Sequence, residues 1–201
     1  MARPRALVLA ALLPLLAACG GAGAAQGTEL TGTVLDPPFE VSSTPLVDTA
    51  GDAFSLTDDT DKPLTLVFFG YSNCPDICGQ VMATLAGTLA RLDDAQKDDL
   101  DVVFVTTDPA RDDEATTAKY VEAFDPSIIG LTGDLDDIVE VGTSLAVGID
   151  KGEKLPSGGY DVTHGTRVYA IDGDDESPMM WDQDVSQAQL AHDVTVLLDE
   201  G

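Results

Sequence analysis

The stretch that decides the fold spans residues 64–78 and reads LTLVFFGYSNCPDIC. Its first part, LTLVFF, is a continuous apolar run with β-branched and aromatic side chains, bounded by Pro63 and Gly70. Such a run is typical of a central strand that is buried on both faces of a sheet. Cys74 and Cys78 follow directly, at the carboxyl end of this strand, where α/β proteins commonly form their sites.

Apolar periodicity predicts alternating helices and strands after this stretch. Leucines and valines at helical spacing predict an amphipathic helix over residues 76–92, and DVVFVT predicts a second buried strand over 101–106. Further elements are expected as a weaker helix over 114–124, a strand near 128–131, a helix over 134–146, a hairpin of strands 168–171 and 179–181 around an Asp-Gly turn, and a last helix behind a capping box at Ser186 and Gln189.

This order of elements predicts an α/β domain with a central mixed sheet that helices cover on both faces. The region between Phe39 and Leu56 is expected to add a small N-terminal strand pair.

The first 18 residues are predicted to be a lipoprotein signal peptide. A basic start precedes an apolar run that is too short to span a bilayer and ends in Leu-Ala-Ala-Cys19. That ending resembles the lipobox of bacterial lipoproteins, in which the cysteine is lipidated. We therefore expect lipid on Cys19, a flexible tether within residues 19–30 and a folded domain over 31–201, held at the outer face of the bacterial cell membrane.

Charge excludes two classes of partner. The chain has 36 Asp and Glu against 10 Lys and Arg, a net charge of −26. So few cations cannot form the basic surface that binds nucleic acid, nor one that docks on anionic lipid. Acidic clusters at 134–137 and 172–176 match no EF-hand loop, so we interpret them as solvated loops and helix starts.

Cys74 and Cys78 remain as a pair once Cys19 carries lipid. Pro75 suits the first position of a helix, which predicts Cys74 as the N-cap with Cys78 one turn further. A helix N-terminus stabilises a thiolate, whereas Asp76 opposes this by charge. Side chains four apart on a regular helix are too distant for a disulfide, which can form only if this turn is loose. Such a bond would close a very small loop and stabilise the fold little, so the pair indicates redox or metal chemistry, with a structural disulfide as the alternative.

Four motifs, in order, resemble those of the Sco/SenC family. They are FFGYSNCPDIC at 68–78, TDPARD at 107–112, GLTG at 130–133 and YDVTH at 160–164. The resemblance covers about residues 50–172. It implies a thioredoxin-like fold and a copper role in assembling cytochrome c oxidase at its CuA centre.

The resemblance also implies the site and its partners. The family's copper ligands carry over to Cys74, Cys78 and His164, a set of two thiolates and one imidazole that suits Cu(I) and tolerates Cu(II). Asp108 and Arg111 are implied to lie near the metal, with a simple turn as the alternative. The implied acceptor is the CuA-bearing subunit of the oxidase, and a copper donor protein and a thiol reductant are further partners.

Some positions depart from the family pattern and leave a rival function open. Gly79 stands where most relatives have proline, and Thr163 and Gly165 flank the histidine in place of Asp and Ser. The rival is a thiol–disulfide oxidoreductase in which Cys74 and Cys78 cycle to reduce the CuA cysteines or other exported proteins. The CxxxC spacing, and Thr166 where that class has a cis-proline, favour the copper function.

Overall fold

The computed structural model describes residues 29–200 apart from 61, 155–159 and 164, and for 150–163 and 200 it describes the backbone alone. The strands are β1 Thr33–Glu40, β2 Leu46–Asp48, β3 Ala53–Phe54, β4 Leu64–Gly70, β5 Leu100–Thr106, β6 Ile129–Thr132, β7 Asp150–Lys154, β8 Tyr160–Thr163, β9 Val168–Asp172 and β10 Glu176–Trp181. The helices are α1 Cys78–Leu89, α2 Asp94–Asp98, α3 Glu114–Glu122, α4 Leu135–Ser144 and α5 Gln187–Glu200.

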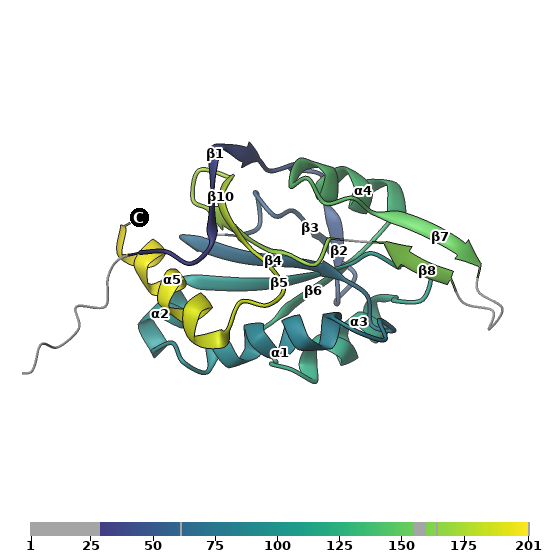
Figure 1. The fold of residues 1–201 in the computed structure, drawn as a ribbon. Helices are drawn as coiled ribbons and strands as arrows, with labels where there is room; N and C mark the ends of the chain where they lie inside the picture. Colours follow the sequence, from purple (N-terminus) through teal and green to yellow (C-terminus); the bar gives the residue numbers. More distant parts are fainter. Residues whose placement is uncertain (1–28, 61, 155–159, 164, 201) are drawn as a thin grey trace, which may run out of the picture.

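Within the described residues, eight strands form one mixed sheet in the order β1-β10-β9-β4-β5-β6-β2-β3 (Figure 1). β4 lies at its centre, parallel to β5 and antiparallel to β9. All seven residues of β4 are buried, which confirms the predicted central strand. β7 and β8 pair with each other as a separate hairpin, which extends from one end of the molecule.

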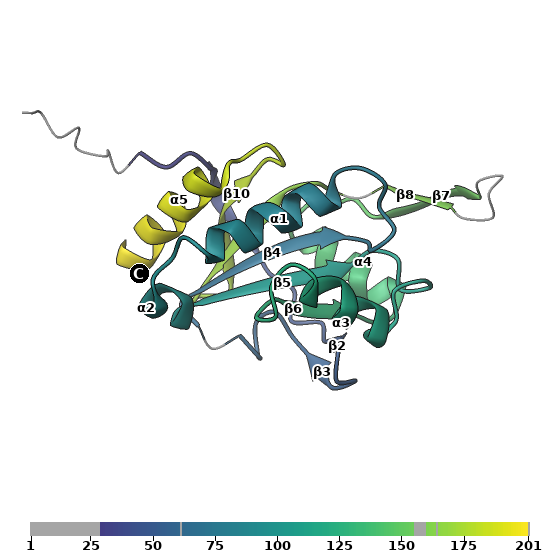
Figure 2. The same cartoon turned by 90° about the horizontal axis from the view of Figure 1, so that it is seen from below.

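Helices cover both faces of the sheet, as predicted. Leu66 and Phe68 point to one face, where they pack with buried residues of α1, α3 and α5. Figure 2 shows α1 and α3 lying over the strands of the sheet. Val67 and Phe69 point to the other face and pack with α4 and the segment around β2 and β3. The alternation of side chains along β4 therefore divides the core into two layers.

Several predicted elements differ from the structure in their details. The first long helix begins at Cys78 instead of residue 76, because Ile77 is the N-cap and its carbonyl accepts hydrogen bonds from the N–H groups of Gln80 and Val81. Cys74 is therefore not the N-cap, and Pro75 is not the first helical residue. This correction places Cys74 in the loop between β4 and α1.

Other differences come from contacts that are remote in sequence. The predicted N-terminal strand pair is confirmed as β2 and β3, and β2 joins the edge of the sheet at β6. The long edge strand β1, the short helix α2 and the strands β7 and β8 were not predicted. The YDVTH motif that ends at His164 contains β8. The capping box at Ser186 and Gln189 is present at the start of α5.

A buried carboxylate secures the chain that enters β1. Oδ2 of Asp193, in α5, accepts hydrogen bonds from the backbone N–H groups of Thr31 and Gly32, at 2.9 Å each, and from Trp181 Nε1, at 2.8 Å. Gly32 crosses so close to the indole that a Cβ there would lie 2.6 Å from Trp181 Nε1. Position 32 therefore requires glycine because of this close approach.

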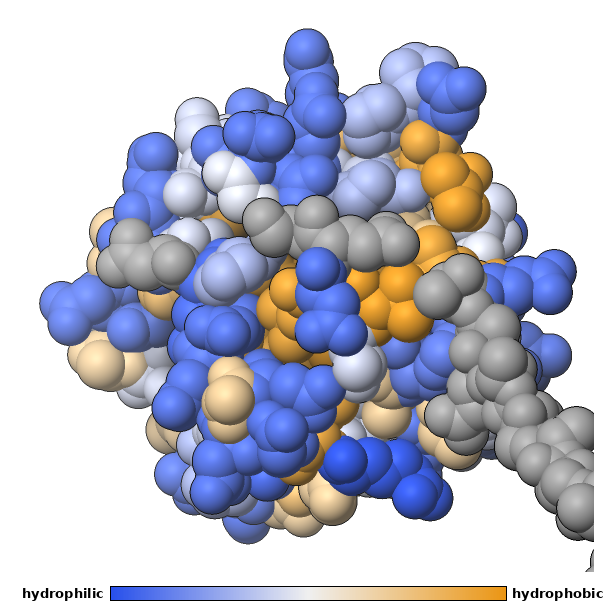
Figure 3. Space-filling model, turned by 90° about the vertical axis from the view of Figure 1, so that its left-hand side faces the viewer, coloured by the Kyte–Doolittle hydropathy of each residue, from blue (hydrophilic) through white to orange (hydrophobic). Residues whose placement is uncertain are grey.

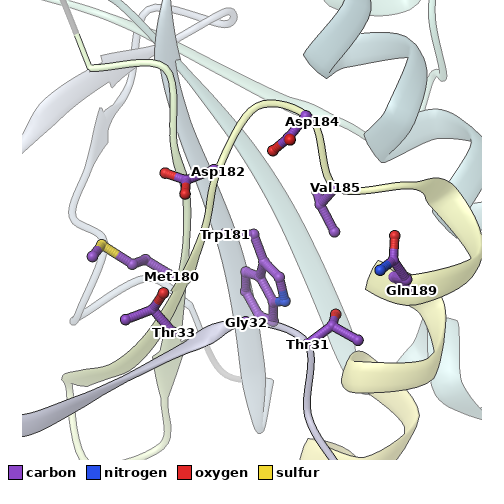
Figure 4. A pocket seen from close by; sticks show the side chains of 9 residues that line it. All are labelled: Thr31, Gly32, Thr33, Met180, Trp181, Asp182, Asp184, Val185 and Gln189. Carbon is purple, nitrogen blue, oxygen red and sulfur yellow. The ribbon is translucent and has the colours of Figure 1, made fainter.

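A hollow of about 170 Å³ lies beside this crossing, between Thr31–Thr33, the end of β10 and Gln189 (Figure 4). The described residues that line it carry neither thiol nor imidazole. The end of the molecule that carries α5 is mostly hydrophilic, with apolar side chains exposed near its centre (Figure 3). In the described part of the chain, no helix has the length and apolarity that crossing a membrane requires.

Candidate metal centre

Three segments of the chain meet at the carboxyl end of β4. Gly70 is the last residue of β4 and pairs with Thr106, the last residue of β5, so the loops after both strands begin side by side. β9 runs in the opposite direction and starts at Val168, opposite Phe68. The loop to α1, the loop to α3 and the chain that enters β9 therefore share one end of the sheet (Figure 2).

The loop to α1 places the two thiols in different surroundings. Cys74 is partly buried in the loop, and its N–H donates to the carbonyl of Tyr71, at 3.2 Å. Cys78 is the first residue of α1 and is fully buried in the core layer that contains Phe68. The two thiols are hydrogen-bonded to each other. The pair thus combines one accessible sulfur with one sulfur in the core.

These surroundings separate the acidities of the two thiols. Partial burial raises the pKa of Cys74, but hydrogen bonds from the backbone N–H groups of residues 76–78 and from the Cys78 thiol outweigh it, so its pKa lies below the usual value. Burial raises the pKa of Cys78 well above its usual range, and its hydrogen bond to Cys74 adds to this effect. Cys74 is therefore the thiol of the pair that ionises first.

Gly70 presses the end of β4 against the buried sulfur. A Cβ at position 70 would lie 3.1 Å from Cys78 Sγ and 2.9 Å from the ring of Phe68. These distances are shorter than ordinary van der Waals contacts, so the absence of a side chain at Gly70 is what lets α1 start so close to the strand. The position of Cys78 thus depends on a glycine that the sequence showed only as a strand boundary.

The loop after β5 brings together Asp108 and Arg111, both expected near the metal. Arg111 forms an ion pair with the buried carboxylate of Asp108. The guanidinium also lies over the ring of Tyr71, 5.7 Å from its centroid. Arg111 therefore connects this loop to the chain that leads to Cys74, and its effect on a bound metal stays a prediction.

Two further residues at this end were missed by the sequence reasoning. Asp112, the last residue of the TDPARD motif, is fully buried and bonds to the loop that leads to Cys74. Tyr120, in α3, packs on Phe104. Burial, followed by the charges of Cys78 and Cys74, raises the pKa of its phenol. The motif could have indicated Asp112, whereas no signal in the sequence distinguished Tyr120.

The third expected ligand, His164, lies outside the described residues. Among the residues that are described, no group of three or more His, Cys, Asp or Glu side chains could hold a metal ion. The other histidine, His192, is half-buried in α5 and lies outside the dithiol loop. The structure thus brings Cys74 and Cys78 together, and it leaves the place of the imidazole untested.

Iodoacetamide should distinguish the two thiols in the folded protein. We expect Cys74 to be alkylated at least about tenfold faster than Cys78 at neutral pH, because rate follows thiolate population and access. Peptide mass spectrometry after timed quenching measures both rates. In guanidinium the two rates should converge, and equal rates in the folded protein would contradict the asymmetry.

Substituting Gly70 should disturb both the core and the buried thiol. We expect Gly70→Ala to lower the free energy of unfolding by about 1–3 kcal/mol, because the added methyl overpacks Cys78 and Phe68. Urea denaturation measures this change. Gly79→Ala is the matched control, since nothing lies within 4 Å of a Cβ there and alanine favours a helix. A Gly70→Ala protein as stable as the Gly79→Ala protein would refute the close packing.

Comparison with known proteins agrees with this fold and motif order. Residues 32–199 match the SCO1/SenC family. The mitochondrial SCO2 homolog of Danio rerio is 33% identical over 131 residues, which cover 60% of this chain and 47% of that protein. The aligned region spans about half the length of the curated relatives.

Solved structures of relatives share the architecture. The copper-bound ScoI of Bradyrhizobium japonicum matches with a TM-score of 0.69 at 30% identity, over 77% of this chain and 97% of that one. The copper-bound ScoI of Arabidopsis thaliana gives a TM-score of 0.71 at 26% identity, over 81% and 99%. The predicted thioredoxin-like α/β fold is confirmed. The chain therefore belongs to the SCO1/SenC family.

Proposed function

We propose that this protein binds copper through Cys74, Cys78 and His164 and uses it to load or prepare the CuA site of cytochrome c oxidase. The observation that carries the proposal is the placement of the two thiols beside each other, Cys74 in the loop after β4 and Cys78 at the start of α1. Relatives with 26% and 30% identity have structures with copper bound, which supports the choice of metal.

The donor set suits copper as a cargo. Two sulfurs and one imidazole match the preference of Cu(I) for soft ligands and are accepted by Cu(II). Binding requires both thiols to lose their protons, so copper binding would release the proton of the buried Cys78 as well as that of Cys74. Three protein ligands leave one side of the ion open to attack by a ligand of the acceptor.

Described residues next to His164 support its part in the set. Gly165 follows it in sequence and packs closely enough that a Cβ there would lie 3.2 Å from Val147. Three residues later Val168 begins β9 opposite Phe68, near the end of β4 that leads to the thiols. The chain on the carboxyl side of His164 therefore enters the sheet at the dithiol end.

Thiol–disulfide exchange is the second candidate function. A partly exposed Cys74 with a lowered pKa, beside a buried thiol, is the arrangement of an attacking and a resolving cysteine. The substrate would be the cysteine pair of the CuA subunit or of another exported protein. A thiol reductant would regenerate the pair, and a donor protein would supply copper to the reduced form.

We further propose that lipid on Cys19 anchors the protein at the outer face of the bacterial cell membrane. The lipobox-like sequence before Cys19 supports the anchor. The strongly acidic composition offers little attraction to anionic lipid, so the acyl chains would supply the membrane affinity.

Anaerobic Cu(I) titration of the full chain against a competing chelator tests the copper function. We expect one tightly bound equivalent, which Cys74→Ser and Cys78→Ser abolish or weaken by at least about 100-fold because each removes a soft ligand. His164→Ala should weaken binding about 10- to 100-fold.

His192→Ala is the matched control, since it removes the other histidine while sparing the proposed ligands, and it should bind copper like the parent protein. Binding that is weak in the parent, or indifferent to His164→Ala, would favour thiol–disulfide exchange. The reduction potential of the Cys74–Cys78 pair would then be compared with that of the acceptor's cysteines.

Substituting Cys19 tests the anchor. We expect Cys19→Ser to move the protein from the membrane fraction to the soluble fraction and to abolish the mass increase from acylation. Fractionation of bacterial cells and intact-mass measurement give the two readouts. Membrane retention of Cys19→Ser without acylation would contradict the lipid anchor.

A further inference from the structure

The loop that carries Cys74 is tied to a buried carboxylate that lies 40 residues further along the chain. Asp112 Oδ2 accepts a hydrogen bond from the backbone N–H of Ser72, at 2.8 Å, and Oδ1 accepts one from the Ser72 hydroxyl, at 2.5 Å. Ser72 is two residues before Cys74. Asp112 thus hydrogen-bonds to both the main chain and the side chain of Ser72, near the start of the loop that carries Cys74.

The same carboxylate is fixed to the sheet. Oδ2 of Asp112 also accepts from the hydroxyl of Thr106, at 2.7 Å, at the end of β5. The carbonyl of Asp112 accepts from Thr132, at the end of β6, at 2.8 Å, and from Thr117, in α3, at 3.4 Å. Asp112 is fully buried, so these bonds form away from water, where a carboxylate and its partners are held most firmly.

Neighbouring bonds fix the base of the loop and leave its tip less constrained. The N–H and hydroxyl of Thr107 both donate to the carbonyl of Gly70, at 2.7 and 3.2 Å. Residues 70–72 are therefore bound to the β5 side. Asn73, Pro75 and Asp76 beyond them are exposed. Because residues 70–72 are held in place, the position of Cys74 depends on where this base of the loop is fixed.

We propose that Asp112 is a positioning residue that fixes the base of the cysteine loop and so holds the Cys74 sulfur at Cys78. Fixing residues 70–72 to the sheet raises the effective concentration of the Cys74 thiol beside the helix start. Loss of Asp112 releases Ser72, and the two sulfurs then meet less often, both around a metal ion and in a disulfide.

An amide can take over this geometry without the charge. In Asp112→Asn, the amide oxygen accepts from the Ser72 N–H and the Thr106 hydroxyl, and the amide N–H donates to the Ser72 hydroxyl, which rotates to accept. In Asp112→Ala all three bonds are lost. The two variants therefore separate a positioning effect from the effect of a buried negative charge.

The test measures the dithiol–disulfide equilibrium of the full chain with dithiothreitol. As the Cys74–Cys78 bond forms, oxidised dithiothreitol takes up the two electrons and two protons that the thiols release. We expect Asp112→Ala to shift this equilibrium about tenfold toward the dithiol, since a lost hydrogen bond changes an equilibrium constant by roughly that factor. Asp112→Asn should stay within about threefold of the parent, as near-neutral substitutions do.

Asp193→Ala is the matched control. It removes another fully buried carboxylate, whose bonds go to Thr31, Gly32 and Trp181 and to none of the dithiol loop. It should destabilise the fold yet leave the disulfide equilibrium within about threefold of the parent. An equal shift in Asp193→Ala and Asp112→Ala would overturn the proposal, as would an Asp112→Asn protein that is as impaired as Asp112→Ala.

Two variants that each remove one hydroxyl donor to Asp112 keep the test valid if Asp112→Ala does not fold. Ser72→Ala and Thr106→Val each lose one bond to Asp112, and each should shift the equilibrium in the same direction by a smaller factor. Ser72→Ala also loses the bond from Asn73, and Thr106→Val the bond from the N–H of Asp108, so agreement between the two variants is required. No shift in either variant would refute the positioning role.

The copper measurement rests on the proposed function, whereas the disulfide equilibrium does not. We expect Asp112→Ala to weaken Cu(I) binding about 10- to 100-fold, as the loss of groups that orient metal ligands does. If the parent protein fails to bind copper while the disulfide equilibrium still responds to Asp112→Ala, the copper function fails and the positioning role stands.

Discussion

The buried central strand β4 fixes the arrangement of the rest of the domain. A strand that is buried on both faces is shielded from water, so its backbone N–H and C=O groups must hydrogen-bond to neighbouring strands on both edges. β4 pairs along five residues or more with β9 and with β5, so those strands are fixed in register against it. Burial of Phe68 and Phe69 on opposite faces requires helices on each side. The chain then leaves the core at Gly70, where the loop to the cysteines begins.

Close packing at the end of β4 explains why two neighbouring thiols differ. Cys78 starts α1 directly against Gly70 and the core, so its side chain is shielded from bulk water. Cys74 stays in the loop, where backbone N–H groups of the first turn face its sulfur. The two proposed functions, copper binding and disulfide exchange, would both use this pair of one accessible and one shielded thiol, and they would compete because metal binding requires both thiols reduced and deprotonated.

Much of the fold could be predicted because its information is local. The run over residues 64–69, the periodic apolar residues of α1 and α4 and the capping box at Ser186 each act within one element, so they identified that element. The start of α1 could not be predicted in the same way. Pro75 suits the start of a helix, but the N–H of Cys74 bonds to the carbonyl of Tyr71 in a turn, and the helix begins only at Cys78.

The sequence by itself determined the element types, the central strand, the dithiol and the family resemblance, because periodicity and motif spacing are properties of neighbouring residues. Tertiary structure alone decided which thiol is exposed and which residues hold the loop. Ser72 meets Asp112 across 40 positions, and Thr31 meets Asp193 across 162. Such partners depend on strand order and burial, because a buried carboxylate takes its hydrogen-bond donors from whatever the folded sheet places beside it.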